Sequence, residues 1–110
     1  MMITSDSIEV LEREMPTSDS ISRILKENMS LMKKRFGVRT IALFGSFVRE
    51  EAGENSDIDI LVEFEHATFD RYMDLKFFLE DLFGRNVDLV LSDSIKPRAR
   101  TTILREARYV

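Results

Sequence analysis

Apolar side chains between residues 21 and 36 recur every three or four positions, which is the spacing of one face of an α-helix. These positions are Ile21, Ile24, Leu25, Met29, Met32 and Phe36. Ser18 or Asp19 can cap the start of this helix, and Gly37 can end it. We therefore expect one amphipathic helix from about residue 19 to residue 36.

Upstream of this helix, Ile8, Leu11 and Met15 also have helical spacing, although the first fifteen residues carry few apolar side chains. We interpret residues 1–18 as an N-terminal extension that contains a short helix. Residues 19–110 are expected to form one domain.

Three further stretches have the patterns of β-strands. The segment "RTIALFGS" is an apolar run that Gly45 ends, as in a buried strand. The segment "DIDILVEFE" alternates, which puts Asp57 and Asp59 on the side opposite its isoleucines. The segment "NVDLVLS" predicts a third strand, and it also contains a carboxylate, Asp88.

The remaining segments predict a helical turn and two helices. The turn is "FVREEAG", directly after the first strand. Thr68 can cap a helix that Gly84 closes, and Pro97 fits the first turn of a last helix that runs through Tyr109. The side chains expected to pack inward from the first of these helices are Phe69, Tyr72, Leu75, Leu79, Leu82 and Phe83. The order of elements indicates an α/β (α+β) fold, a small mixed β-sheet backed by helices.

Composition narrows the class of protein. The 110 residues carry a net charge of −4 and no cysteine, which excludes disulfides and thiolate chemistry. No apolar run approaches the ~18 residues of a membrane span, and the N-terminus lacks the layout of a signal peptide. We expect a cytoplasmic protein with no membrane partner and no direct nucleic-acid partner.

Charge is unevenly placed along the chain. Residues 50–65 hold seven acids and no lysine or arginine, whereas residues 96–108 hold five bases and one acid, Glu106. The C-terminal bases read either as a solvated helix face or as a group in which Arg98 or Arg100 reaches a nucleotide or an acidic partner. His66, the one histidine, reads as a loop residue.

Asp57, Asp59 and Asp88 are the candidate catalytic and metal-binding residues. Asp57 and Asp59, two apart on a strand, point to one side at roughly 6–7 Å, and they repel by about 2–3 kcal/mol at an effective dielectric near 20. If the third strand is a neighbour, Asp88 joins them. Carboxylates of this kind hold Mg²⁺, and two such ions about 3.5–4 Å apart can clamp the reacting oxygens of a phosphoryl displacement.

The Gly45–Ser46 turn supplies a complementary feature. Glycine lets the backbone approach a ligand closely, and Ser46 would open a helical turn whose free N–H groups attract phosphate. Gly-Ser alone is a common turn, and Asp-x-Asp alone is common on surface strands. Their combination in strand–turn–strand order favours a nucleotide site.

The segment from Gly45 to Val62 resembles the signature of the DNA polymerase beta-like nucleotidyltransferase superfamily: Gly-Ser, a ten-residue spacer, then Asp-x-Asp. The short length and the ending "KPRARTTILREARYV" resemble its MNT branch, the minimal nucleotidyltransferases, which are typically encoded beside HEPN-domain proteins as toxin–antitoxin pairs. The resemblance covers residues 20–110 and implies the polymerase beta-like palm fold.

For the site, the resemblance implies that Asp57 and Asp59 ligate two Mg²⁺ ions. Asp88 would ligate the catalytic ion and help to deprotonate the incoming hydroxyl. The reaction would be in-line attack on the α-phosphate of ATP, with pyrophosphate leaving.

Around the nucleotide, the resemblance implies that Gly45 and Ser46 contact the β- and γ-phosphates and that Ser56 belongs to the nucleotide-binding residues. Arg49 matches an arginine of the spacer, which contacts phosphate or braces the loop. Glu50 stands where the family often has glycine, so the geometry of this loop is open.

The implied function is AMP transfer from ATP to a tyrosine of a HEPN-domain toxin, which silences its RNase activity. Two alternatives stay open: a non-catalytic antitoxin that binds its partner through the same fold, and nucleotidyl transfer to a small molecule or RNA. Because three strands make a small sheet, we also expect a homodimer or a hetero-oligomer.

Overall fold

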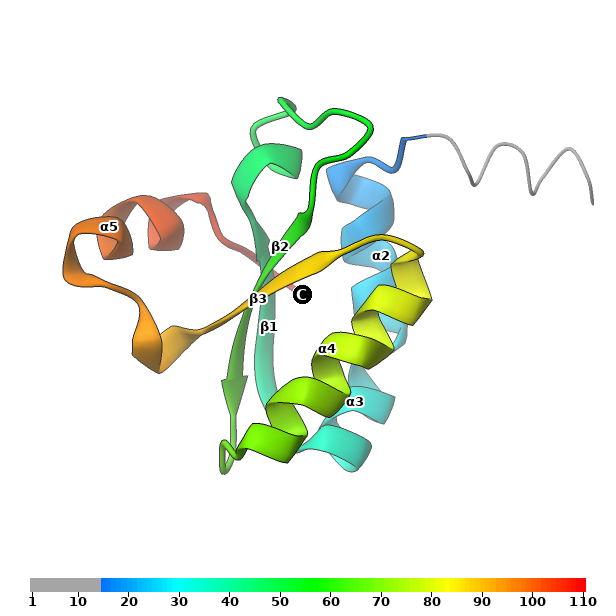
Figure 1. Cartoon of the computed structure of the whole chain (residues 1–110), viewed down its shortest axis with the longest axis vertical. Helices are drawn as coiled ribbons and strands as arrows, with labels where there is room; N and C mark the ends of the chain where they lie inside the picture. Colours follow the sequence, from blue (N-terminus) through cyan, green and yellow to red (C-terminus); the bar gives the residue numbers. More distant parts are fainter. Residues whose placement is uncertain (1–14) are drawn as a thin grey trace, which may run out of the picture.

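A mixed β-sheet forms the centre of the fold in the computed structural model, which describes residues 15–110. Its strands are β1 (Val38–Phe44), β2 (Ile58–Phe64), β3 (Val87–Leu91) and β4 (Arg108–Tyr109), in the order β3-β2-β1-β4. β1 is antiparallel to β2 and to β4, whereas β2 and β3 are parallel. The predicted fold class, a small mixed sheet backed by helices, is confirmed (Figure 1).

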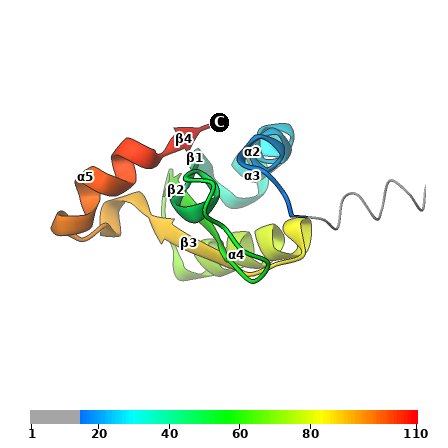
Figure 2. The same cartoon turned by 90° about the horizontal axis from the view of Figure 1, so that it is seen from above.

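Three helices cover one face of this sheet: α2 (Ser18–Glu27), α3 (Met29–Phe36) and α4 (Phe69–Phe83) (Figure 2). Every second residue of the strands points toward these helices, and these are the residues that the apolar pattern assigns to one side of each strand. The buried side chains of this main core include Ile21, Leu25, Met32, Ile41, Leu43, Ile58, Ile60, Val62, Leu75, Leu79, Val87 and Leu89. Because these residues face the helices, the aspartates between them face the other way.

The expected single helix over residues 19–36 is wrong: it is two helices. Thr17, rather than Ser18 or Asp19, caps α2. Its hydroxyl accepts the Ser20 N–H at 3.1 Å, and the Ser20 hydroxyl accepts the Thr17 N–H, which makes a capping box. The break falls at Asn28, whose side-chain amide donates to the Ile24 carbonyl at 2.9 Å. This side-chain contact competes with the helical backbone pattern at that position.

Helix α4 begins and ends where the pattern predicts. The Thr68 hydroxyl accepts the Arg71 N–H at 3.1 Å, and Gly84 ends the helix in the left-handed conformation with φ 63°. Phe69 does not pack inward as expected, since it is 76% exposed. At 3.6 residues per turn it lies roughly 100° around the helix from the buried side.

The opposite face of the sheet is only partly covered, by α5 (Pro97–Glu106) and the 3₁₀ turn η2 (Ser92–Ser94) (Figure 2). A second, smaller core forms there from Ala42, Phe44, Leu61 and Ile95, with Ala99 and Ile103 against it. The uncovered part of this face carries the aspartates of β2 and β3.

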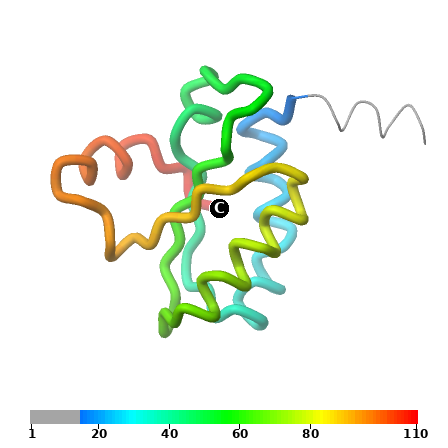
Figure 3. Tube along the Cα trace, viewed as in Figure 1, coloured from blue at the N-terminus to red at the C-terminus, as the bar shows by residue number. Residues whose placement is uncertain are grey.

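The last helix ends at Glu106, and not at Tyr109 as expected. Arg108 and Tyr109 instead pair with Leu43 and Ala42 of β1, and the Val110 N–H donates to the Ile41 carbonyl at 3.1 Å. The chain thereby satisfies the backbone groups along the edge of β1. Figure 3 shows the chain returning from α5 toward the sheet, where its C-terminal strand β4 lies at the edge beside β1.

The helix expected within residues 1–15 falls, except for Met15, outside the described residues. In the part of the chain that is described, no helix is both long and apolar enough to cross a membrane.

Candidate active site

Asp59 lies in the second position of β2, between the end of β1 and the start of β3. Its cross-strand partners are Phe44 on one side and Asp88 on the other. Ile58 and Val87, the preceding residues of the two strands, face the main core, so Asp59 and Asp88 both project from the opposite face. Asp57 directly precedes β2 and is exposed. The structure therefore brings Asp59 and Asp88 side by side, with Asp57 at the entrance of the strand.

The environment of Asp59 disfavours its charge. Burial is the largest cause of a pKa raised from 3.8 to about 6, and the neighbouring carboxylates of Asp88 and Asp57 add to the rise. The capacity of a protonated Asp59 to hydrogen-bond with Asp88 acts in the same direction on the pKa of Asp59. The Ser46 backbone N–H opposes them, since it donates to the charged form. The negative charge of Asp59 is therefore destabilised by burial and by the neighbouring carboxylates of Asp88 and Asp57.

A hard cation suits this negative charge, because carboxylate oxygens are the ligands that Mg²⁺ takes in proteins. In residues 15–110, no group of three or more His, Cys, Asp or Glu side chains is arranged so that it could hold a metal ion. Two carboxylates, those of Asp59 and Asp88, lie together and supply oxygen donors of the kind that Mg²⁺ takes. Asp57, exposed and outside the strand, would have to turn toward them to complete the set.

The turn after β1 is pressed against Asp59. Gly45 opens the 3₁₀ turn η1 (Gly45–Phe47) with φ 82°. A Cβ atom on Gly45 would overlap the Asp59 carboxylate, with the Asp59 Cγ at only 2.8 Å. Glycine is therefore required here for two reasons, the left-handed backbone and the close approach. Ser46 follows at the surface of the turn, while Phe47 is buried in the main core.

Arg49 braces the loop that follows the turn. Its Nη1 donates to both carboxylate oxygens of Glu106 at 2.9 and 3.0 Å, and its Nε donates to Glu51 at 3.0 Å. These two partners raise the pKa of Arg49, with Glu51 the larger cause. Glu50 adopts the left-handed conformation with φ 61°, the conformation that glycine would adopt freely at this position.

Ser56 closes the spacer next to Asp57. Its hydroxyl accepts the Gly53 N–H at 2.8 Å, and its carbonyl accepts from Arg85 Nη1 at 3.0 Å. A cavity of about 360 Å³ lies beside it, lined by residues 54–57 and 84–86. Ser56 thus lies at a polar hollow on the β3 side of Asp57.

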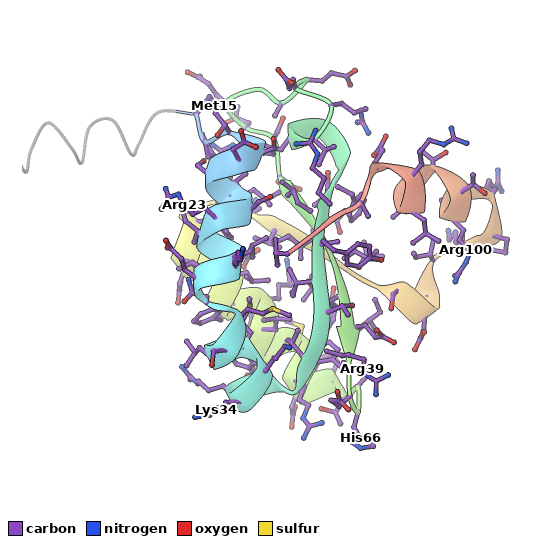
Figure 4. All side chains as sticks on the ribbon, turned by 180° about the vertical axis from the view of Figure 1, so that it is seen from behind. Met15, Arg23, Lys34, Arg39, His66 and Arg100 are labelled. Atoms are coloured by element: carbon purple, nitrogen blue, oxygen red, sulfur yellow. The ribbon has the colours of Figure 1, made fainter. Side chains whose placement is uncertain are left out.

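The sequence pattern did not predict that Glu106 lies at the site. Its carboxylate accepts the Gly45 N–H at 3.2 Å as well as Arg49, which ties the end of α5 to the turn. The signal in the sequence was its place as the one acid among the bases of residues 96–108. Arg98 and Arg100 are exposed, and Figure 4 shows Arg100 out on α5. His66 lies in the loop after β2, as expected, and its carbonyl accepts from Arg71.

A carboxylate pair on adjacent strands and a glycine turn held against it therefore lie together on the partly open face of the sheet. The chain belongs to the nucleotidyltransferase domain family, whose profile matches residues 21–110.

Relatives narrow this class further. The protein adenylyltransferase MntA of Thermococcus cleftensis is 45% identical over 97 residues, which span 87% of this chain and 98% of that protein. A solved structure described as a candidate minimal nucleotidyltransferase is 36% identical with a TM-score of 0.72, covering 86% of this chain and 97% of its own.

A third similarity is one of fold alone. It is with a chain in the complex of a tri-AMPylated HEPN toxin and an MNT antitoxin from Shewanella oneidensis. The identity is 19% and the TM-score 0.58, over 80% of this chain and 70% of that one.

Proposed function

We propose that this nucleotidyltransferase transfers AMP from ATP, with Mg²⁺, to a tyrosine hydroxyl of a HEPN-domain toxin and so acts as its antitoxin. The observation that carries the proposal is Asp59, wedged between the Gly45 turn and Asp88. Among residues 15–110, no basic side chain forms an ion pair with Asp59, and the groups that shift its pKa are two other carboxylates and the Ser46 N–H. The similarity to an adenylyltransferase along 98% of that protein's length supports AMP as the group transferred.

In the proposed reaction, the β- and γ-phosphates lie against the turn at Gly45 and Ser46, and Ser56 and Arg49 line the nucleotide site. The Gly45 N–H donates to Glu106 in this structure, so the turn would contact phosphate through its other groups. Asp57, Asp59 and Asp88 would hold two Mg²⁺ ions, which supply neutralisation of phosphate charge.

The hydroxyl oxygen of the acceptor forms a bond to the α-phosphorus, and the bond from that phosphorus to the bridging oxygen of the β-phosphate breaks. Pyrophosphate leaves, and the proton of the hydroxyl passes to Asp88. The protein otherwise contributes positioning, which is the main requirement of this chemistry.

A partner is part of the proposal because the aspartates lie on a sheet face that α5 covers only in part. Asp57 and Asp88 are both exposed, so a large acceptor can approach them from solvent. A protein of the same fold in complex with a tri-AMPylated HEPN toxin supports this kind of acceptor.

Label transfer tests the proposal. The protein is incubated with Mg²⁺ and ATP labelled at the α-phosphate in native lysate of its source cells, and labelled proteins are separated by mass. The matched variants are Asp59→Asn, which keeps the shape of the side chain, and Asp74→Asn, an exposed acid on α4. We expect one labelled band of a partner with the wild type and with Asp74→Asn, and none with Asp59→Asn.

Two results would contradict the proposal. A band of equal intensity with Asp59→Asn would place the chemistry elsewhere. A partner that co-purifies with the wild type without label would indicate instead the non-catalytic antitoxin.

A further inference from the structure

Glu106 connects the end of α5 to the nucleotide turn. One oxygen of its carboxylate accepts the N–H of Gly45 at 3.2 Å and Arg49 Nη1 at 3.0 Å, and the other accepts Arg49 Nη1 at 2.9 Å. The side chain of Glu106 is only 18% exposed. The two partners lie 61 and 57 residues away in the chain. A contact of this kind fixes the C-terminal segment and the site relative to each other.

The place of Glu106 on its own helix is unfavourable. It is the last residue of α5, and a carboxylate at a helix C-terminus opposes the helix dipole. What favours it are the charge-assisted contacts with the guanidinium of Arg49 and with the N–H of Gly45, a buried residue. The position of the Glu106 carboxylate is therefore favoured by its contacts with Arg49 and Gly45 and not by the helix that carries it.

Arg49 is held at two of its three nitrogens. Nε donates to Glu51 and Nη1 donates to Glu106, whereas Nη2 has no acceptor among residues 15–110. A guanidinium is planar, so two fixed nitrogens also fix the direction of the third. The N–H groups of Nη2 remain available to an anion.

We propose that Glu106 is a positioning residue for the nucleotide: it holds Arg49 and the Gly45 turn in place so that Nη2 of Arg49 can donate to the triphosphate. This inference rests on the proposed function, because it assigns the anion at Nη2 to ATP. Glu106 itself does not touch the substrate. Glu106 orders the Arg49 side chain before ATP binds, so that less side-chain entropy is lost when Nη2 donates to phosphate.

The opposite role would make Glu106 a stand-in for phosphate that ATP must displace. The free Nη2 argues against it, since Arg49 can keep Glu106 and still donate to a second anion. The two roles differ in sign: loss of the Glu106 charge weakens nucleotide binding if it positions Arg49, and strengthens binding if it competes.

Binding of Mg-ATP to the Glu106→Gln variant distinguishes these roles. Glutamine keeps an oxygen for the Gly45 N–H but removes the charge that orients Arg49. The matched control is Glu65→Gln, which breaks the ion pair with Arg39, at 3.1 Å, at the other end of β1. Figure 4 labels Arg39 near His66.

We expect Glu106→Gln to weaken Mg-ATP binding about tenfold, the effect of losing one charge-assisted hydrogen bond. In transfer assays the Michaelis constant for ATP should rise by a similar factor while kcat changes less than twofold. Glu65→Gln should change neither. In an Arg49→Gln background, Glu106→Gln should have no further effect on binding, because there is no guanidinium left to orient.

Three results would overturn the inference. Tighter binding by Glu106→Gln would show competition with phosphate. Unchanged binding with a lowered melting temperature would show a purely structural contact. An equal loss of binding in the Arg49→Gln background would show that Glu106 acts by another route.

A second readout separates this inference from the proposed function. If the wild type binds no Mg-ATP, the proposed function fails, and NMR of the free protein still tests the contact. The Arg49 Nη–H signals should be resolved in the wild type, where Glu106 holds Nη1, and averaged by rotation in Glu106→Gln. An Arg49 signal that is identical in both proteins would refute the positioning role independently of nucleotide.

Discussion

Replacing Asp59 with asparagine should make the protein more stable while it abolishes nucleotidyl transfer. The side chain keeps its shape, and its oxygen can still accept the Ser46 N–H. What is lost is a negative charge that burial, Asp88 and Asp57 all disfavour. A partly buried charge without a compensating partner lowers the stability of the folded protein.

The magnitude follows from the pKa of Asp59. A rise from 3.8 to about 6 corresponds to roughly 3 kcal/mol at about 1.36 kcal/mol per pKa unit. Asp59 is only partly buried, so solvent screening reduces this figure, and we expect about 1–1.5 kcal/mol at pH 7.5. For a domain of this size, such a gain raises the melting temperature by roughly 4–8 °C.

The difference in stability between Asp59→Asn and the wild type should depend on pH in a definite direction. Because the folded-state pKa of Asp59 is raised, the folded protein takes up the proton first as pH falls through 6. The wild type therefore gains stability relative to Asp59→Asn between about pH 7 and pH 4, and the advantage of the variant should vanish near pH 4. Millimolar Mg²⁺ should stabilise the wild type more than the variant.

The assay is thermal and urea unfolding of wild type, Asp59→Asn and the control Asp74→Asn across this pH range without metal. Asp74 is exposed on α4, so its replacement should change the free energy of unfolding by less than about 0.5 kcal/mol. A variant at Asp59 that is less stable than the wild type at pH 7.5 would refute the reasoning. So would a stability difference that does not depend on pH.

Three further changes are tested by urea unfolding, two at the site and one at the start of α2. Gly45→Ala should lower the free energy of unfolding by about 2 kcal/mol or more and reduce Mg-ATP binding, since φ is 82° and the new methyl group meets the Asp59 carboxylate. Unchanged stability would mean that the turn can retreat. Glu50→Gly should raise stability by about 0.5–1 kcal/mol by relieving the left-handed strain at φ 61°, and a loss would contradict that strain. Thr17→Ala should lower stability by about 1 kcal/mol through loss of the capping box, whereas retained stability would mean that Ser20 alone caps α2.

The parts of the fold that follow local patterns were predictable from the sequence. Two-residue alternation correctly assigned the two faces of β2, and Thr68 and Gly84 correctly marked the ends of α4. The parallel pairing of β2 with β3 then brought Asp59 opposite Asp88. The roles of these aspartates in metal binding stay predictions.

The parts that depend on distant contacts were not predictable. β4 and the place of Glu106 arise from pairing with a strand and a turn about sixty residues earlier in the chain, which no local pattern encodes. The helix break at Asn28 coincides with a side-chain hydrogen bond to the Ile24 carbonyl inside an otherwise continuous apolar stripe, and the spacing of apolar residues does not reveal such a contact. Phe69 was misplaced because spacing alone does not say how wide the buried side of α4 is.

The most direct test of nucleotidyl transfer uses ATP that carries one isotope at the α-phosphate and another at the γ-phosphate. The protein, the HEPN-domain partner proposed above and Mg²⁺ are incubated together, and the two isotopes are counted on the partner and in released pyrophosphate. We expect only the α-isotope on the partner, with the γ-isotope recovered in pyrophosphate. The γ-isotope on the partner would indicate phosphoryl transfer, and neither isotope on a stably bound partner would contradict a catalytic role for the Asp59 site.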